Sequence, residues 1–422
     1  MMYTRKTEFD RRRVAVIGGG AAGMMAAISA AECGASVTLF ESNDRLGKKL
    51  RITGKGRCNV TNNCDPQEFF SNVPRNPRFL YAALSKFGTE DTMAFFEAAS
   101  VPLKTERGKR VFPVSDKAGD IVSAMQKKCK DLGCEIVHEK IKRVIVSDGK
   151  VTGVTGSRGE YAFDAVILCT GGKSYPLTGS DGSGYDIAKA LGHSVTPLIS
   201  SLVPIVEDGS LCASMMGLSL KNVRLTIIDK TKNKPVFSDF GEMLFTHFGL
   251  TGPLVLSASA HMRDIEKGKY KAEIDLKPAL DEKTLDARLI SDFAKYNNRD
   301  FINSLDSLLP QKMIDTVVRR SGIDPRKKVN SITKEERKRL LGLLKHFEIS
   351  LLRFRPIDEA IITSGGIEVK EINPKTMESK LVQGLYFAGE IIDVDAYTGG
   401  FNLQIAFSTG HLAGVCAAEA EF

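Results

Sequence analysis

Glycines at a fixed spacing near the N-terminus are the first residues whose arrangement indicates chemistry. Gly18, Gly20 and Gly23 follow a short β-branched run, and Glu41 ends the next apolar run, about 20 residues further on. Between a strand and a helix, this spacing lets a diphosphate approach the helix start, and the acidic residue can bind ribose hydroxyls. A plain turn is the alternative for three glycines alone. The predicted dinucleotide-binding residues here are Gly18, Gly20, Ala21, Ala22, Gly23 and Glu41.

The segment at residues 47–63 combines glycine with basic side chains. Glycine permits close approach of the backbone to a ligand, and Lys and Arg can offset the charge of a diphosphate. A solvated basic loop is the alternative. Because the segment has no sustained apolar period, we expect a loop, or a loop that leads into a helix. The residues predicted to contact the cofactor are Lys48, Lys49, Arg51, Gly54, Gly56, Arg57 and Asn59, with Ile141 added from the stretch before a predicted hairpin.

Two later segments favour FAD over NAD, which the first fingerprint alone does not separate. Thr170, Gly171 and Gly172 end a buried run, and this pattern is similar to a loop that two-dinucleotide-domain flavoproteins bring near their cofactor. Gly389-Glu390 resembles the segment of those enzymes that places an acidic residue on the ribityl chain of the flavin. Those enzymes usually have Asp there, so Asp393 is the alternative to Glu390 for this contact.

A further glycine opens the last predicted helix, at residues 402–418. Gly400 precedes Phe401, Asn402 and Leu403. The first amides of a helix are unpaired and lie at the positive end of its dipole. They can therefore hold the pyrimidine edge of an isoalloxazine, where negative charge collects on reduction. Close packing in the core is the alternative role for this glycine.

Six short motifs are spread over the chain: Gly18–Gly23, Thr53–Asn59, Gly171–Pro176, Thr178–Tyr185, Leu244–His247 and Gly399–Gln404. Together they resemble a bacterial family, the BaiN-like flavoproteins, which include bile-acid enone reductases and aminoacetone oxidases. The similarity extends over nearly the full chain. It implies an FAD-binding domain of two separated chain parts, which carries an inserted β-barrel-like domain and a small helical domain. Ala396, Asp181 and Ser183 depart from the family pattern, and we expect these departures to tune substrate choice.

Polar side chains in or beside these motifs are the candidates to line the flavin and the substrate. The predicted substrate pocket contains Tyr175, Asp181, Tyr185 and Tyr397, although ordinary packing is the alternative for each tyrosine. His247 is the candidate catalytic residue because an imidazole can supply a proton near neutral pH. A hydrogen-bonded histidine at a domain junction is the alternative.

Cys58 and Cys64 raise the question of a redox dithiol. Five residues lie between them, whereas disulfide-using flavoenzymes have four, and the chain has no Cys-x-x-Cys. We therefore expect neither cysteine to be catalytic. The eight cysteines are scattered without metal-ligand spacing, so reduced thiols are expected and no metal site is predicted.

The elements that position these residues alternate between strands and helices. Residues 14–17, 21–31 and 36–40 predict a strand, a helix and a second strand, which a right-handed crossover makes parallel neighbours. We predict an α/β fold in which a Rossmann-like FAD-binding domain is interrupted by an inserted β-barrel-like domain and a small helical domain. The expected boundaries are 1–195 for the first part of the FAD-binding domain, 196–280 for the β-rich substrate domain, 281–345 for the helical insertion and 346–422 for the return through the β-rich domain and the second part of the FAD-binding domain.

Composition narrows the expected partners. The formal charge of +8 comes without a long run of Lys or Arg, so nucleic acid is disfavoured as a partner. The N-terminus lacks the apolar core of a signal peptide, and no run approaches the roughly 20 apolar residues of a membrane span. We expect a cytoplasmic protein that acts on a small molecule and has no membrane partner. The sequence carries no signal for oligomeric state.

Three functional hypotheses follow. The first is an FAD-dependent oxidoreductase that takes electrons from NAD(P)H and reduces a small organic substrate such as a conjugated carbonyl. Because no second Gly-x-Gly-x-x-Gly unit is visible, NAD(P)H is expected to bind transiently or in the insertion. The second is an oxidase that transfers electrons from a small amine to dioxygen. The third is a flavin-dependent RNA-modifying or binding protein, which the dispersed charge disfavours.

Overall fold

The chain folds into two units, one of which is built from both ends of the sequence. The structure is a computed structural model that describes residues 11–262 and 264–420. Unit 1 contains the chain up to Ser200 and the chain from Ile357 onward, and unit 2 contains Ser201–Pro356. A parallel-sheet unit made of both chain ends and interrupted by a barrel-containing insertion is thus the observed arrangement, and the predicted fold class is confirmed.

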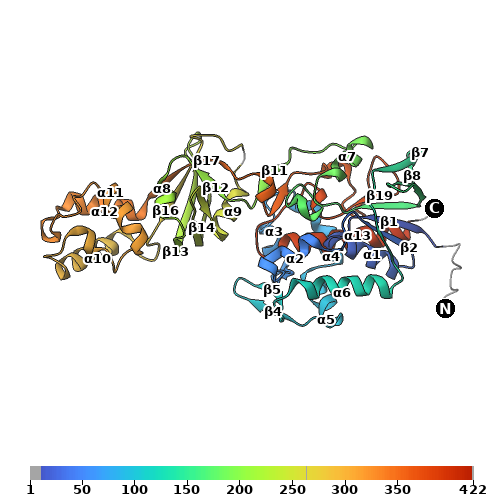
Figure 1. Ribbon diagram of the computed structural model, residues 1–422, viewed down its shortest axis with the longest axis horizontal. Coiled ribbons are helices and arrows are strands. Elements are labelled where there is room, and N and C mark those ends of the chain that lie inside the picture. Colours follow the sequence, from blue (N-terminus) through green and yellow to red (C-terminus); the bar gives the residue numbers. More distant parts are fainter. Residues whose placement is uncertain (1–10, 263, 421–422) are drawn as a thin grey trace. The chain divides into compact units, whose positions relative to one another are not determined.

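A continuous apolar run forms the central strand of unit 1. Val14 to Ile17 are buried on both faces, as expected for a strand inside a parallel sheet covered by helices. Val16 pairs in parallel with Leu39 on one side and with Ile167 on the other. The sheet has the order β19-β10-β1-β2-β6 (Figure 1). Its strands are β1 (Arg13–Ile17), β2 (Ser36–Glu41), β6 (Glu135–His138), β10 (Ala165–Leu168) and β19 (Leu385–Phe387).

The first and last helices of the described chain lie side by side against this sheet. Helix α1 (Ala21–Glu32) and helix α13 (Phe401–Glu419) are the dark blue and red helices of unit 1 in Figure 1. A Cβ atom on Gly410 would lie 2.4 Å from the carbonyl oxygen of Ala22, and one on Gly414 would lie 2.4 Å from that of Ala26. Only glycine allows this backbone contact. Since both residue numbers rise together, the two helices run parallel.

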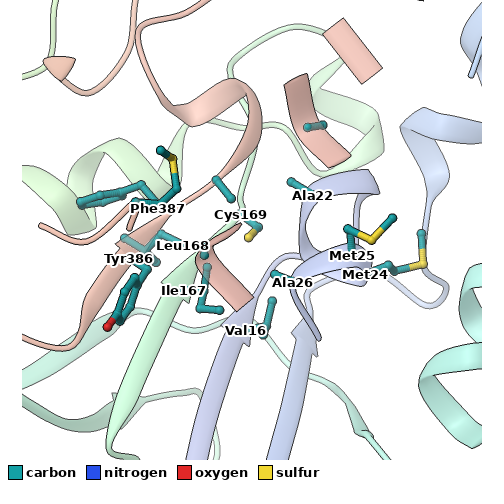
Figure 2. Packing of buried hydrophobic residues seen from close by; sticks show 14 of the residues in the cluster. Val16, Ala22, Met24, Met25, Ala26, Ile167, Leu168, Cys169, Tyr386 and Phe387 are labelled. Atoms are coloured by element: carbon teal, nitrogen blue, oxygen red, sulfur yellow. The ribbon is translucent and has the colours of Figure 1, made fainter. Parts of the chain in front are cut away.

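The core of unit 1 fills the space between the sheet and α1. Figure 2 shows Val16, Ile167 and Phe387 on the strands, with Met24 and Met25 on the helix. All five side chains are buried, and burial of each stabilises the fold by roughly 1.5–3 kcal/mol. Helix α1 is apolar on nearly every face because the sheet and other helices surround it.

The rest of unit 1 surrounds the sheet with short helices and two small antiparallel sheets. At residues 47–63 we expected a loop, or a loop that leads into a helix. The structure has the reverse order: a short helix comes first and the glycine loop follows it. The reason is that Gly47 adopts a left-handed conformation and starts a turn of helix at once. The helices are α2 (Lys48–Ile52), α3 (Pro66–Ser71), α4 (Tyr81–Lys86), α5 (Thr89–Ala98), α6 (Ala118–Asp131) and α7 (Ser183–Ala190). The strands are β3 (Thr61–Asn62), β4 (Leu103–Glu106), β5 (Arg110–Pro113), β7 (Arg143–Ser147), β8 (Lys150–Thr155) and β9 (Glu160–Ala162), and β11 (Ile199–Ser201) pairs with β18 (Ile362–Ser364).

Unit 2 is a closed antiparallel barrel with a helical insertion. In β13 the buried residues Val223, Leu225 and Ile227 alternate with more exposed ones, which is the pattern of a strand with one face inside a barrel. The barrel order is β12-β15-β14-β13-β16-β17. Its elements are β12 (Ile205–Glu207), α8 (Leu211–Ser214), β13 (Ser219–Asp229), β14 (Lys234–Phe245), β15 (Gly249–Thr251), α9 (Pro253–Ser259), β16 (Tyr270–Asp275), α10 (Glu282–Lys295), α11 (Gln311–Ser321), α12 (Lys334–Lys345) and β17 (Phe347–Phe354).

Candidate functional site

The glycine fingerprint forms a tight turn between β1 and α1, and each glycine has a different task. Gly18 has φ +105°, and a Cβ there would lie 2.5 Å from the carbonyl oxygen of Cys169. A Cβ on Gly23 would lie 1.8 Å from the carbonyl oxygen of Gly18, so close packing of the turn on α1 requires glycine. Around Gly20 no atom lies within 4 Å of the Cβ position. The space in front of the α1 N-terminus, where Ala21 and Ala22 begin the helix, is therefore open to a ligand.

Glu41 closes this turn from the end of β2. Its Oε2 accepts a hydrogen bond from the Gly19 amide at 2.9 Å, and its Oε1 accepts from the Asn43 amide at 2.8 Å. The carboxylate is buried and fixed in orientation. A carboxylate has about four lone-pair sites, so it can still accept hydrogen bonds from ribose hydroxyls. This position matches the role predicted for Glu41.

The N-terminus of α13 lies against strand β3 of unit 1. Gly400 caps the helix with φ +100°, and a Cβ there would lie 2.3 Å from the carbonyl oxygen of Thr61. The Asn402 side chain accepts from the Ala396 amide at 2.9 Å and donates to the Ala396 carbonyl at 2.7 Å. The Asn402 side chain therefore fixes the loop before α13. Phe401, Asn402 and Leu403 form the first turn of the helix, and the amides of this turn have no intrahelical acceptor.

The N-termini of α1 and α13 are offset along the axis that the two parallel helices share. Because Gly410 contacts Ala22, Phe401 lies eight residues ahead of Ala21 along the shared axis. At 1.5 Å per residue, the offset is about 12 Å. This spacing suits a ligand with a diphosphate at one end and an anionic ring edge at the other, joined by a short extended chain. FAD has this layout.

Buried polar atoms around the open space test whether a polar ligand fits. Arg51 Nε, Asn59 Oδ1 and Thr170 Oγ1 are buried and have no hydrogen-bond partner among the residues that the structure describes. Each such atom costs about 1–3 kcal/mol if it stays unpaired. All three belong to segments predicted to bind the cofactor. The residues therefore fit a polar cofactor such as FAD, which would supply the missing partners.

The loop that carries Asn59 has an unusual backbone. Gly54, Lys55, Gly56 and Cys58 all have positive φ, between 56° and 85°. Two of them are not glycine, and a left-handed conformation costs such residues energy. Strain held in a rigid loop is typical of segments that place backbone groups against a ligand.

Glu390 joins three parts of the chain. Its carboxylate pairs with Lys49 of α2 at 2.5 Å, and it accepts from Ser174 Oγ at 3.0 Å and from the Thr363 amide at 2.8 Å. Beside it, Gly389 lies against α1, where a Cβ would be 2.8 Å from the Ala22 side chain. Glu390 is thus next to the α1 start, as the predicted ribityl contact requires, and Lys49 balances its charge.

Asp393, the alternative to Glu390, has other partners. Arg75 forms an ion pair with it, with Nη2 at 2.8 Å from Oδ2. Asn76 Nδ2 donates to its backbone carbonyl at 2.6 Å. Asp393 is buried, so this pair holds the loop before α13 on the segment before α4. Sequence reasoning missed Arg75 and Asn76, since no motif surrounds them.

The remaining basic residues of the glycine loop are tied to carboxylates. Arg57 Nη2 lies 2.6 Å from Asp116 and also pairs with Glu106. The hydrogen bond to Glu106 has the larger effect, and both hydrogen bonds raise the pKa of Arg57. Lys48 Nζ lies 2.7 Å from Asp44. These cations already compensate local acids. Their predicted contact with a diphosphate stays a prediction.

Further predicted cofactor contacts lie on the sheet side of the site. Gly171 has φ +73°, and a Cβ on Gly172 would be 2.5 Å from Thr363 Oγ1. Both follow β10, at the carboxyl edge of the parallel sheet, where ligands of such folds bind. Ile141 is buried just before β7.

The predicted substrate residues differ in protonation. Burial opposes ionisation of Asp181, but the ion pair with Lys140 at 2.6 Å and the hydrogen bonds of Ser183 lower its pKa to about 2. Burial, aided by Asp395, raises the pKa of Tyr397 to about 12. Burial also raises the pKa of Tyr185, whose hydroxyl donates to the Glu390 carbonyl at 3.4 Å. Near neutral pH, Asp181 is therefore anionic and these tyrosines are protonated.

For two other predicted residues the structure gives only the local surroundings. Tyr175 has φ +54° and caps the single turn at Pro176–Thr178. His247 belongs to unit 2, where it is exposed in the turn between β14 and β15, with its ring 5.0 Å from that of Phe248. Its catalytic role stays a prediction.

The cysteines give no sign of a redox pair at the site. All eight are free thiols. Burial raises the pKa of Cys58 to about 12 and that of Cys64 to about 11, so neither forms a thiolate near neutral pH. Among the described residues, no group of three or more His, Cys, Asp or Glu is arranged to hold a metal ion. Nor does the described part of the chain contain a helix long and apolar enough to cross a membrane.

The sequence from residue 12 to 416 matches the family described as HI0933-like protein Rossmann domain. The chain belongs to this family. The family resemblance drawn from the motifs is confirmed, and with it an FAD-dependent oxidoreductase. A 3-dehydro-bile acid delta(4,6)-reductase of Clostridium scindens is 30% identical over 96% of this chain and 99% of its own length. A ribosomal RNA dihydrouridine synthase of Haemophilus influenzae is 31% identical over 94% of this chain and 96% of its own length.

A solved structure shares the fold of this HI0933-like protein. It is the 3-ketosteroid delta1-dehydrogenase from Sterolibacterium denitrificans, with a TM-score of 0.51, 12% identity, and coverage of 96% of this chain and 99% of the other. At this identity the likeness shows the fold alone. FAD is implied by the FAD-binding fold of the family. The free space at the Cβ position of Gly20, in front of the α1 start, leaves room for part of such a ligand.

Proposed function

We propose that this protein is an FAD-dependent reductase that uses NAD(P)H to reduce a carbon–carbon double bond conjugated to a carbonyl group. The observation that carries this proposal is the chemistry common to the two relatives that match almost full length. The name of one describes reduction of ring double bonds in a 3-oxo bile acid, and that of the other describes conversion of uridine to dihydrouridine. Both reactions add two hydrogens across a double bond next to a carbonyl.

The chain's own residues support such a reaction in three ways. When bound, FAD supplies the hydride transfer. The first amides of α13 can stabilise negative charge on the ring edge that they face. A proton must also reach the substrate, and Tyr397 lies three residues before Gly400 and is protonated near neutral pH. Asn402 Nδ2 lies 3.3 Å from the Tyr397 carbonyl and fixes this loop on α13. We propose Tyr397 as the proton donor of unit 1.

Anaerobic stopped-flow spectroscopy tests the electron donor. We expect NADH or NADPH to bleach the visible absorbance of the bound flavin, and a conjugated enone to restore it. Failure of both nucleotides to bleach the flavin would exclude the reductase. In that case, rapid reduction by a small amine, followed by peroxide release in air, would support the oxidase alternative.

A second candidate substrate is uridine in RNA, and the charge distribution favours it. Unit 2 contains 27 of the 59 Lys and Arg residues and 20 of the 51 Asp and Glu residues. Its 156 residues thus have a formal charge of +7, and the other 266 residues have +1. The positive charge that looks dispersed along the sequence is therefore concentrated in one unit, as in proteins that bind polyanions.

Substrate competition separates the two candidates. The reduced protein is mixed either with a small cyclic enone or with unmodified ribosomal RNA, and the rate of flavin reoxidation is followed without oxygen. Faster reoxidation by RNA, with dihydrouridine in the digested product, supports the RNA substrate. Faster reoxidation by the enone alone supports a small-molecule reductase.

A further inference from the structure

Unit 2 contains a cavity of about 400 Å³ where the barrel meets α11. Three cations line it: Lys230 directly after β13, Lys271 in β16 and Arg320 in the last turn of α11. Asn233, in the turn between β13 and β14, and Ser350 of β17 add an amide and a hydroxyl. None of these residues belongs to the predicted cofactor site.

The cations of this cavity differ in how they are held. Arg320 Nη1 donates to the carbonyl of Glu348 at 2.8 Å, and its guanidinium carbon lies 4.5 Å from the Phe347 ring centroid. The remaining N–H groups of the guanidinium stay available. Lys271 pairs with the carboxylate of Glu348, which lines the same cavity. In the described part of the chain the Lys230 ammonium has no acceptor. The cavity therefore contains one ion pair, one ammonium without an acidic partner, and a guanidinium that Glu348 and Glu207 only partly compensate.

The positive charge continues from the cavity along the helices. Residues 319–339 contain nine basic and three acidic side chains. Arg339 of α12 donates Nε to the carbonyl of Ser321 at 3.4 Å, which brings a second guanidinium to the end of α11, next to Arg320. Figure 1 shows α11 and α12 side by side within unit 2. Three of the nine basic residues are in ion pairs: Lys327 with Glu336, Lys328 with Asp300 and Arg337 with Asp286. The other six have no ion-pair partner among the described residues, so positive charge is present beyond the cavity.

Guanidinium and ammonium groups together with amide and hydroxyl donors match the oxygens of phosphate. A molecule with a single phosphate would use the cavity alone, whereas a polynucleotide would also use the charge along α11 and α12. We propose that this basic cavity, with the end of α11, binds the phosphodiester backbone of RNA, and that unit 2 is the RNA-binding unit. This inference deepens the second candidate function. It requires no reduction of the flavin.

The test is equilibrium binding of a short fluorescein-labelled single-stranded RNA to the full-length, FAD-loaded protein, followed by fluorescence anisotropy over a salt series. Two variants address the cavity: Lys230→Glu, which removes no hydrogen bond or ion pair among the described residues, and the double variant Lys230→Glu/Arg320→Glu. The matched control is Lys127→Glu/Lys130→Glu, because both lysines are exposed on α6 of unit 1.

We expect the cavity double variant to bind the RNA at least ~10-fold more weakly, with the slope of log Kd against log salt reduced by about 2, and the single variant to fall between. The control should bind as the wild type does. The inference is wrong if the cavity variants and the control bind RNA equally, or if millimolar inorganic phosphate displaces the RNA completely, which would indicate a site for free phosphate. Since NAD(P)H is absent, failure of the reductase proposal leaves this result unchanged.

Discussion

At the scale of single residues, glycines of one motif have separate tasks. Gly18 and Gly23 are required by the backbone itself, because a Cβ at either would strike a carbonyl oxygen. Gly20 is different, since a side chain there would meet nothing in the protein. A glycine at position 20 is thus explained by a ligand that approaches the backbone. A substitution there can therefore test cofactor binding without disturbing the fold.

The variant Gly20→Val tests this separation. We expect the flavin-free variant to match the flavin-free wild type in urea stability within about 0.5 kcal/mol, since surface changes without contacts rarely exceed this. Its visible flavin absorbance after purification should be largely lost, because the valine fills the space in front of α1. Gly342→Val is the control, as its Cβ site in α12 is also empty. Normal flavin content in Gly20→Val would contradict the site.

The hydroxyl of Tyr397 gives a second residue-scale prediction. Tyr397→Phe should lower kcat for the conjugated substrate by roughly 10²-fold or more, because a positioned proton donor contributes about this much. Flavin absorbance and the rate of reduction by NAD(P)H should stay unchanged. Tyr296→Phe in unit 2 serves as the control. A normal kcat in Tyr397→Phe would reassign the proton donor, and His247 would then be the next candidate.

The sequence indicated which segments to consider for the candidate site, but not which residues their side chains would pair with. The segments with Arg51, Asn59 and Thr170 were identified because glycine and polar residues cluster around them. The pairing of Arg57 with Glu106 could not be predicted, since 49 residues separate them and either could meet many other charges. Ion-pair partners depend on tertiary packing, which local patterns do not encode.

At the scale of elements, the contact between α1 and α13 organises the cofactor site. The strand, helix and strand at residues 14–40 were predictable because their apolar periods are strong. Strand β14 (Lys234–Phe245), in contrast, has buried residues only near its C-terminal end, at Met243 and Phe245. Its first half is mostly exposed and mixes polar residues with Val236, Phe237 and Phe240, and pairing with β13 holds it in the sheet. A local apolar pattern alone does not reveal such a strand.

Substitution in the helix contact should affect both folding and the cofactor. Gly414→Ala places a methyl group 2.4 Å from the Ala26 carbonyl oxygen, so α13 must move away from α1. We expect a loss of unfolding free energy of about 1–3 kcal/mol in urea titrations, as for other overpacked contacts. Flavin content should fall with it. Gly342→Ala, with an unobstructed Cβ site in α12, should be neutral or stabilising, and equal behaviour of the two variants would refute the contact.

At the scale of the whole molecule, buried histidines link stability to pH. Burial lowers the pKa of His193, His261 and His411 below the usual 6.5, although nearby acids oppose the effect for His193 and His411. The folded state therefore holds these groups neutral, whereas the unfolded chain protonates them below about pH 6.5. Their contribution to stability is present above that pH and is lost as the pH falls.

We expect the free energy of unfolding to fall by about 1 kcal/mol or more between about pH 7 and pH 5, measured by urea denaturation at constant ionic strength. Most carboxylates titrate below this window, so histidines dominate it. The variant His411→Gln retains a polar group for Ser29, which bonds the His411 ring at 2.9 Å. Its stability should vary less with pH than that of the wild type. A flat profile in the wild type would contradict this account.

The parallel packing of α1 and α13 has a consequence for which flavin the protein accepts. The N-termini of the two helices lie about 12 Å apart, and each can bind an anionic group. A ligand long enough to contact both should therefore bind more tightly than a shorter one. FMN has a single phosphate and lacks the second half of the dinucleotide, so it would leave the Glu41 carboxylate without the ribose hydroxyls predicted to bind there. Selectivity for the longer flavin would then arise from the helix offset itself, and apoprotein offered equal amounts of FMN and FAD should take up FAD.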